Sequence, residues 1–229
     1  MAAVRACSFP SLKESVMRIR FFAGAAAVLF SASLVAHADT VYTNQSAYNA
    51  AVNTTATITF NGIAPANSFV QESNPFTLSG STFTFSPGSS AYIIDPAYYG
   101  SSYAGGGFLT VDYTTPTDTL TVTLPSVTAV SFDFGGLFGT GDPFAVTLSD
   151  GTMFSTTTTN GITGTDALTF LGFTSTTPLT SITFTLPDTP NYNALDNLSY
   201  GAATPEPSSF MLLGTGLLGA VGILRRRYV

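Results

Sequence analysis

The sequence has no tryptophan, one cysteine and one histidine, and its seven basic residues lie near the two ends. Between Asp39 and Thr204 there is no Lys, Arg, His, Cys or Trp, whereas the same stretch has eleven carboxylates. Nucleic-acid binding needs cationic side chains against phosphate, so we do not expect this function. Catalysis by Ser-His-Asp, Cys-His or lysine Schiff-base chemistry lacks its base, nucleophile or amine. Zinc and iron sites built from histidine or cysteine are not expected either.

The N-terminal segment has the order of a secretory signal. Two arginines precede an apolar run over residues 21–35, and a small-x-small cleavage pattern follows it: Ala36-His37-Ala38 before Asp39. We predict a signal helix within residues 1–38, removed by signal peptidase, with Met17 as an alternative start. An uncleaved membrane anchor is the alternative, but about fifteen apolar residues are few for a membrane span.

The C-terminal segment has a complementary order. Residues 210–224 are uncharged and mostly apolar, and an arginine cluster follows them directly: Arg225, Arg226 and Arg227. About fifteen helical residues rise roughly 22 Å, and the flanking serines and arginine stems extend this toward the roughly 30 Å hydrocarbon core. Because positive charge stays on the cytoplasmic side, we predict a transmembrane helix over 210–224 with the rest of the chain facing outward. A buried core helix is the alternative, which three consecutive arginines disfavour.

A short motif precedes the apolar stretch: Pro205-Glu206-Pro207. With the Gly/Leu-rich span and the arginine cluster, residues 204–229 resemble the PEP-CTERM sorting signal. The resemblance implies that an exosortase, a membrane transpeptidase-like enzyme, recognises Pro205, Glu206 and Pro207. It also implies an exported protein of a bacterium that makes exopolysaccharide. Such a protein is membrane-anchored through its C-terminal helix before processing, and afterwards lies at the cell surface or outside the cell.

The segment between these ends, residues 39–203, has the pattern of an exported β domain. Residues 39–204 contain thirty-five threonines, and threonine is a β-branched residue that favours strands. Apolar residues alternate with polar ones in five runs: Thr57–Phe60, Phe83–Phe85, Leu120–Leu124, Val130–Phe134 and Ile182–Leu186. Gly-containing turn signals separate such runs, and Asp150-Gly151 gives the strongest hairpin prediction. We predict an all-β domain, an antiparallel β-sandwich or jelly roll.

One short helix is predicted near the start of this domain. Asn44 or Thr43 is its N-cap, and Ser46–Val52 has a partial apolar stripe. The closing segment Ala194-Leu-Asp-Asn-Leu-Ser-Tyr200 is similar to that of many PEP-CTERM ectodomains, and related endings occur in carbohydrate-binding-like β-sandwiches. This resemblance supports the fold and implies no particular activity.

Tyrosines cluster around a Gly/Ser-rich loop in the middle of the domain. Tyr98, Tyr99 and Tyr103 lie in or beside the segment Tyr99-Gly-Ser-Ser-Tyr-Ala-Gly105, with Tyr92 and Tyr113 on either side. An exposed aromatic ring with a polar tip suits sugar binding, and loops on a rigid sandwich commonly carry binding sites. The alternative is a long edge loop whose tyrosines cap the core.

Asp196 and Asp133 are candidate cation ligands. Asp196-Asn197 opens the last predicted strand, and Asp133 precedes Gly135-Gly136. Calcium prefers carboxylate, amide and carbonyl oxygens. The favoured alternative is that these side chains bond nearby backbone N–H groups. We expect no cofactor, with calcium as the one exception.

Together with the PEP-CTERM resemblance, which implies the link to exopolysaccharide, the sequence predicts an exported, non-enzymatic surface or matrix protein associated with exopolysaccharide. A carbohydrate-binding module, with or without calcium, is the alternative function. A glycoside hydrolase working through paired carboxylates is the least favoured, although eleven carboxylates make a chance pair easy to find. The expected partners are exosortase, signal peptidase, exopolysaccharide and, through the C-terminal helix, the membrane.

Overall fold

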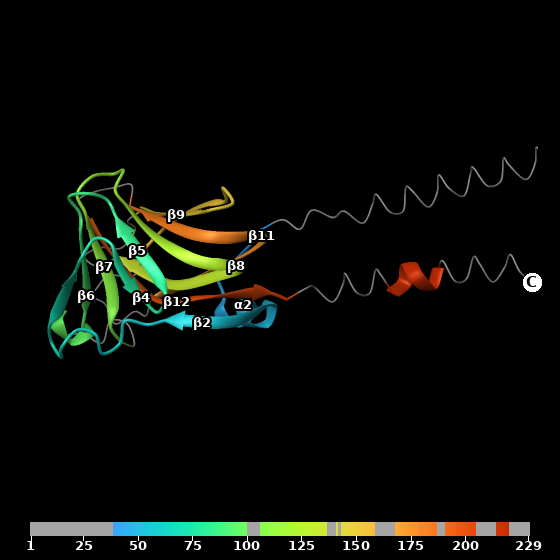
Figure 1. Cartoon of the computed structure of the whole chain (residues 1–229), viewed down its shortest axis with the longest axis horizontal. Coiled ribbons are helices and arrows are strands. Elements are labelled where there is room, and N and C mark those ends of the chain that lie inside the picture. The colour runs from blue at the N-terminus through green and yellow to red at the C-terminus, as the bar shows by residue number, and fades with distance from the viewer. Residues whose placement is uncertain are drawn as a thin grey trace, which may run out of the picture. The chain divides into compact units, whose positions relative to one another are not determined.

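Antiparallel β-strands account for most of this computed structural model, as the alternating sequence predicts (Figure 1). The residues that the structure describes are 39–99, 106–136, 141, 143–158, 168–186, 191–204 and 214–219. The predicted signal peptide up to Ala38, the motif Pro205–Pro207 and the cluster Arg225–Arg227 lie outside them. Residues 214–219 are helical, and no helix of the described residues is long and apolar enough to cross a membrane.

The described part of the domain has one α-helix, one short 3-10 helix and twelve strands. In chain order they are β1 (Thr40–Tyr42), α2 (Gln45–Ala51), β2 (Val52–Ile58), β3 (Phe69–Glu72), β4 (Phe76–Leu78), β5 (Ser81–Phe85), β6 (Ser90–Ile94), η1 (Pro96–Tyr99), β7 (Phe108–Tyr113), β8 (Thr119–Gly136), β9 (Pro143–Leu148), β10 (Met153–Thr157), β11 (Thr169–Thr185) and β12 (Asn191–Ala203).

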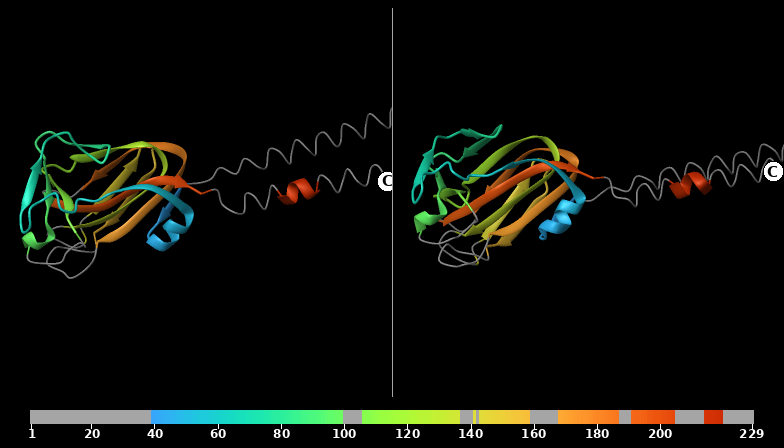
Figure 2. Two further views of the ribbon diagram at one scale, coloured as in Figure 1. Left: turned by 60° about the horizontal axis from the view of Figure 1, so that its bottom comes forward. Right: turned by 90° about the horizontal axis from the view of Figure 1, so that it is seen from below.

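Three long strands, β8, β11 and β12, hold the sandwich together. The main strand order is β10-β9-β11-β8-β12-β7-β6-β3, with β1, β2, β4 and β5 attached beside it. The first half of β8 pairs with β5 and its second half with β12, while β12 itself changes partner from β7 to β2. Because these strands bend and change partners, the strands form one continuous ladder around a shared core (Figures 1 and 2).

The length of β8 differs from the expectation of many short strands. The runs Leu120–Leu124 and Val130–Phe134 belong to one strand of 18 residues. Between them Ser126 has a positive φ of 57°, and the pairing with β11 shifts register at the same place. The strand therefore bends without ending, since backbone pairing resumes on both sides of the irregularity.

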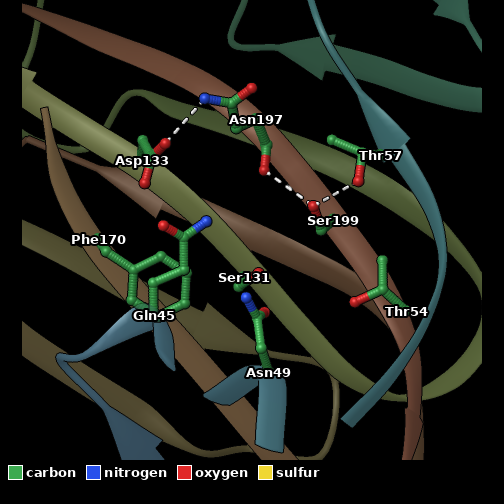
Figure 3. A pocket seen from close by; sticks show the side chains of 9 residues that line it. All are labelled: Gln45, Asn49, Thr54, Thr57, Ser131, Asp133, Phe170, Asn197 and Ser199. Carbon is green, nitrogen blue, oxygen red and sulfur yellow. Dashed lines mark hydrogen bonds between the residues drawn. The ribbon is translucent and has the colours of Figure 1, made fainter. Parts of the chain in front are cut away.

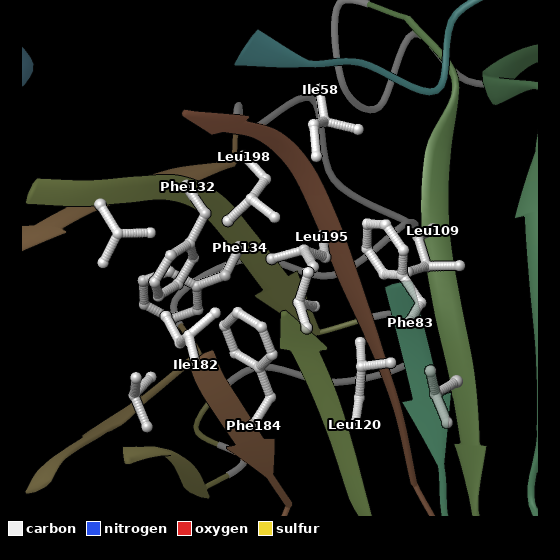
Figure 4. Packing of buried hydrophobic residues seen from close by; sticks show 14 of the residues in the cluster. Ile58, Phe83, Leu109, Leu120, Phe132, Phe134, Ile182, Phe184, Leu195 and Leu198 are labelled. Carbon is white, nitrogen blue, oxygen red and sulfur yellow. The ribbon is translucent and has the colours of Figure 1, made fainter. Parts of the chain in front are cut away.

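The core is rich in phenylalanine, as the period-two pattern predicts. Phe132 and Phe134 point inward from β8 and are 0% and 2% exposed. Phe132 meets Phe184 edge-on at 4.9 Å between ring centroids, and Phe134 stacks on Phe144 at 4.5 Å. Figure 4 shows these rings among leucines and isoleucines from β2, β7, β8, β11 and β12. Alternate residues of the same strands therefore face outward.

Helix α2 covers part of the outer sheet face. Its predicted N-cap is confirmed at Asn44, whose side chain accepts a hydrogen bond from Ala47 N at 3.0 Å. Tyr48 is buried and lies against Gly172 of β11, where an added Cβ would be 2.6 Å from the tyrosine ring. Glycine therefore allows the close approach of helix to strand.

The turn between β7 and β8 is held by a single carboxylate. Asp118 accepts hydrogen bonds from the backbone N–H and hydroxyl groups of Thr114 and Thr115 and from the Ser89 hydroxyl, at 2.8–3.1 Å. Burial alone would raise its pKa, but these bonds outweigh burial and lower the pKa to about 2. Asp118 is therefore an ionised anchor that joins three neighbouring segments.

The hairpin predicted at Asp150-Gly151 is confirmed between β9 and β10. Gly151 has a φ of 93°, which suits glycine, and Asp150 accepts from Thr152 N at 2.9 Å and from the Ser175 hydroxyl at 2.6 Å. The Thr152 hydroxyl in turn donates to Asp39, the predicted first residue after signal cleavage. Asp150 thus bonds its surrounding turn, the alternative preferred for such aspartates.

Candidate functional site

The central strands bring Asp133 and Asp196 side by side on the outer face of the sheet. They are register partners on β8 and β12. Phe132, Phe134 and Leu195 face the core, so the alternating residues Asp133 and Asp196 face away from it. Directly opposed residues of an antiparallel pair have Cβ atoms only about 4.5–5.5 Å apart. The two candidate cation ligands are therefore neighbours.

A bulge in β12 places Asn197 beside this pair. The register between β12 and β8 shifts between Asp196 and Ser199, and Asn197 has a φ of 50°. Asparagine is one of the few residues other than glycine that adopt this conformation readily. The bulge turns its side chain toward β8, where Asn197 Nδ2 donates to Asp133 Oδ2 at 2.8 Å (Figure 3).

A row of hydroxyls continues from this point across the same face. Thr57, Ser199 and Ser131 are register partners on β2, β12 and β8. The Thr57 and Ser199 hydroxyls are 2.8 Å apart, and Ser199 Oγ donates to Asn197 O at 3.2 Å. The strands therefore present a polar floor in place of an apolar face.

Helix α2 and β11 complete a hollow above this floor. Gln45 and Asn49 extend from α2, and the Phe170 ring lies on the β11 side, edge-on to Tyr48 at 5.6 Å (Figure 3). The hollow, hereafter the groove, has a volume of about 330 Å³, and its remaining lining residues are Thr54, Thr57, Ser131, Asp133, Asn197 and Ser199. Three amides, four hydroxyls, one carboxylate and one aromatic ring thus surround one space.

Burial disfavours the charged form of both carboxylates of this pair. Burial raises the pKa of Asp196 to about 6, and the nearby charge of Asp133 adds to this rise. Hydrogen bonds from the backbone N–H groups of Asn197 and Phe60 oppose it. Burial also raises the pKa of Asp133, against the hydrogen bond from Asn197. Asp196 is 2% exposed, and its Oδ1 has no hydrogen-bond partner within the described part of the chain.

Of the three tyrosines predicted as ligand contacts, the structure describes the side chain of Tyr98 alone. Tyr98 is 42% exposed on η1, and its ring lies 5.3 Å from that of Phe69, which also meets Tyr92 at 5.6 Å. Tyr113 is fully buried in the core, as the capping alternative proposes for this cluster. Tyr103 and the side chain of Tyr99 lie outside the described residues. Ligand binding at Tyr98, Tyr99 and Tyr103 stays a prediction.

Several groove residues have no signal in the sequence that separates them from other polar positions. Gln45 and Asn49 are one helical turn apart, and Phe170 belongs to a strand more than a hundred residues later. Only the register of β2, β8, β11 and β12 unites them. Gly172 is the one local sign, since a glycine inside a strand marks a close approach of another segment.

Comparison with known families concerns the C-terminal tail. Residues 203–227 match the family described as the PEP-CTERM protein-sorting motif. The chain carries a PEP-CTERM sorting motif. This motif indicates export with a membrane-anchored sorting signal, and it covers the tail alone. A search of curated proteins finds no match.

Solved structures similar to this chain include β-sandwich carbohydrate-binding domains. A xylan-binding module of family 22 from Paenibacillus barcinonensis shares 12% identity at a TM-score of 0.42, covering 68% of this chain and 98% of its own. A family 11 module from Clostridium thermocellum, in complex with a mixed-linked β-1,3-1,4 tetrasaccharide, shares 14% identity at a TM-score of 0.35, covering 60% and 98%. The K2 cleaved adhesin domain of Lys-gingipain shares 13% at a TM-score of 0.41, covering 58% and 99%.

Proposed function

We propose that this chain is an exosortase-sorted, non-enzymatic surface or matrix protein whose β-sandwich binds a neutral segment of exopolysaccharide in the groove. The observation that supports this proposal is the groove lining: amides, hydroxyls, one carboxylate and one ring around about 330 Å³. Sugar hydroxyls both donate and accept hydrogen bonds, and this set of side chains offers both partners. The Phe170 ring adds an apolar face for the C–H side of a pyranose.

The charge of the groove selects against polyanions. Between Asp39 and Thr204 the sequence has no Lys, Arg or His, so no side chain there can pair with a uronate, sulfate or phosphate. Asp133 lines the groove and repels such groups when it is ionised. A neutral polysaccharide avoids this repulsion and gains hydrogen bonds from Asn49, Asn197 and Gln45.

The arrangement of the two carboxylates disfavours glycoside hydrolysis. Such enzymes place an acid and a nucleophile or base on two sides of the scissile bond. Asp133 and Asp196 come from the same sheet face, and of the two only Asp133 lines the groove. Although the raised pKa of Asp196 resembles that of a catalytic acid, the pair cannot flank one substrate bond.

Sorting is the second part of the proposal. Exosortase recognises Pro205, Glu206 and Pro207, the segment 210–224 anchors the chain in the membrane, and Arg225–Arg227 hold its end on the cytoplasmic side. Substitution of Glu206 and Pro207 should leave the unprocessed form in the membrane fraction, which intact-mass analysis detects. Normal processing of both variants would refute this role for the motif.

Asn197→Gly tests the groove with a matched control. Glycine accepts the φ of 50° at this position, so the change removes the amide without backbone strain. Ser79→Gly is the control, because Ser79 also has a φ of 50° and lies outside the groove lining. The probe is exopolysaccharide purified from the producing bacterium, and affinity electrophoresis of the processed protein measures retention.

We expect wild type and Ser79→Gly to be retarded equally and Asn197→Gly to lose about tenfold in affinity, the effect of one to two hydrogen bonds in a partly buried site. Asn49→Ala should have a similar effect, since Asn49 is exposed on α2 and alanine favours a helix. Equal retention of all variants, or no retention of the wild type, contradicts binding in the groove.

We also propose calcium binding at Asp133 and Asp196, the two candidate cation ligands of the sequence. The pair offers carboxylate oxygens, which a hard cation prefers, and the Asn197 amide, which now donates from Nδ2 to Asp133, would turn its oxygen to the ion. If calcium binds there, added Ca²⁺ should raise the melting temperature of the wild type and leave that of Asp196→Asn unchanged. Equal melting temperatures with calcium and with chelator would exclude the ion.

A further inference from the structure

Three aromatic rings form a second surface at the far edge of the sheet. Phe69 of β3 lies in the centre, edge-on to Tyr92 of β6 at 86° and to Tyr98 of η1 at 82°. Phe69 is 43% and Tyr98 42% exposed, although large apolar groups usually lie inside. The set Phe69, Tyr92 and Tyr98 is named here the edge aromatic cluster.

The cluster is held rigidly, as a binding surface requires. Asp95 Oδ1 accepts hydrogen bonds from Asn67 N and Ala97 N, both at 3.0 Å, and Tyr98 N donates to Asp95 O. The segment before β3 and the η1 turn are therefore tied to the same aspartate. Preformed rings lose little conformational entropy when a ligand stacks on them.

Polar groups accompany the rings on the same face. Gln71 is the register partner of Tyr92 and lies two residues from Phe69, so all three share a face of the sheet. Gln71 Nε2 donates to Ser90 Oγ at 3.5 Å. Flat rings beside an amide and a hydroxyl suit the two sides of a pyranose, which has C–H faces and hydroxyl edges.

Strand register places this cluster on the same sheet face as the groove. At the cluster end, Phe69 of β3 pairs with Ile94 of β6, which pairs with Phe108 of β7. At the groove end, Asp196 of β12 pairs with Asp133 of β8, which pairs with Phe170 of β11. Leu109 pairs with Leu195, so their neighbours Phe108 and Asp196 continue the row across β7 and β12. Five steps between strands separate Phe69 from Phe170, about 24 Å along the sheet at about 4.8 Å per step.

The middle of this row is not part of either surface. Ile94, Phe108 and Asp196 are at most 3% exposed, whereas accessible groups lie at the two ends. The groove and the edge aromatic cluster are thus two separate surfaces on one face. A short oligosaccharide can contact only one of them at a time, whereas contact with both needs a longer polymer that follows the twist of the sheet.

We infer that the edge aromatic cluster is a second, stacking subsite for the same neutral polysaccharide, so that long chains bind through two contacts. This inference rests on the proposed function of the groove. Two linked contacts raise affinity for a polymer well above that of either alone. Loss of the second contact therefore weakens binding of long chains and leaves short fragments unaffected.

Phe69→Leu tests the second subsite, because leucine keeps an apolar side chain and removes the flat ring. Met153→Leu is the control, since Met153 is 74% exposed on β10, at the opposite end of the strand order. The probes are the purified exopolysaccharide, intact and partially hydrolysed to short oligosaccharides. Affinity electrophoresis measures the former and calorimetry the latter, both with the processed protein.

We expect Phe69→Leu to lower affinity for intact polysaccharide about fivefold to tenfold and to leave short-fragment binding at the wild-type value. Asn197→Gly should weaken both probes. Unchanged binding of intact polymer by Phe69→Leu would overturn the second subsite and leave the groove proposal standing. Equal losses on both probes, or a change of oligomeric state on gel filtration, would also overturn it, while no binding by wild type would defeat both proposals.

Discussion

Asp118 and Asp196 are two aspartates of one domain in opposite surroundings. Both are buried, at 7% and 2% exposed. Asp118 accepts five hydrogen bonds at a turn, and its pKa falls to about 2. Asp196 has an unpartnered Oδ1 within the described part of the chain, and its pKa rises to about 6.

The comparison shows that hydrogen-bond donors decide the balance against burial: Asp118 has enough of them to keep its charge, whereas burial prevails at the candidate site residue Asp196. No positive side chain lies between Asp39 and Thr204, so a buried carboxylate there depends on N–H and O–H groups for compensation. Where threonines supply them, the charge stabilises the fold. Where they are too few, as at Asp196, the pKa of the carboxyl rises, and one of its oxygens is left for another partner.

The largest expected effect comes from removing the anchor. Asp118→Ala leaves the N–H groups of Thr114 and Thr115 without their acceptor, so we expect it to lower the free energy of unfolding by about 3 kcal/mol. Urea denaturation at pH 7 measures this change. Asp112→Ala is the control, because Asp112 is a half-buried aspartate of β7. An equal loss of stability in this variant would show that Asp118 is no special anchor.

The pH dependence of Asp118 follows from its lowered pKa. Its ionised form is favoured by folding, so its stabilisation is complete above about pH 4 and is lost as the pH falls toward 2. The isosteric Asp118→Asn should show a flatter stability curve over this acid range. A wild-type curve that is flat between pH 4 and 2 would contradict the anchoring role.

Asp196→Asn is expected to have a smaller effect of opposite sign. Because folding favours the protonated form, wild-type stability should fall as pH rises from about 4 to about 6 and stay low above it. The amide mimics the protonated carboxyl, so the variant should be more stable by about 2 kcal/mol at pH 7 and equal at pH 4. Thermal melts at both pH values test this, and equal stabilities at pH 7 would contradict the shift.

The smallest effect should come from making Asp118 resemble Asp196. Thr115 Oγ1 supplies the hydrogen bond to Asp118 Oδ1, so Thr115→Val leaves that oxygen with one partner fewer. We expect a loss of about 1 kcal/mol and a rise of the Asp118 pKa toward its ordinary value. Carboxyl-carbon NMR titration follows the pKa directly, and an unchanged titration would show that the backbone N–H groups suffice.

Local patterns account for the fold better than for the site. The runs of alternating apolar residues lie in or overlap β2, β5, β8 and β11, as predicted. The Asn44 cap and the Asp150-Gly151 hairpin are also confirmed. These features depend on neighbours in sequence. Pairing of Asp133 with Asp196 depends instead on which strands adjoin and in which register, and the sequence named both residues without that information.

The groove escaped prediction for a specific physical reason. Asn197 reaches Asp133 only because a bulge gives it a positive φ, and no local pattern separates this asparagine from others in turns. Gln45 and Asn49 face the groove because Tyr48 packs on Gly172, a contact between segments about 125 residues apart. Long-range packing therefore decides which polar residues become a site.

The last described strand has a mechanical consequence for a protein held by its tail. Thr204 is tied back to Ala51 O by both its N–H and its hydroxyl, and β12 runs between β8 on one side and β7 and β2 on the other. Tension entering at Thr204 pulls along the axis of β12. Its many cross-strand bonds then share the load in shear, and do not open one at a time. In the proposed tethered form, β12, which contributes Asn197 and Ser199 to the floor of the groove, therefore also transmits the tension from the tail into the sheet.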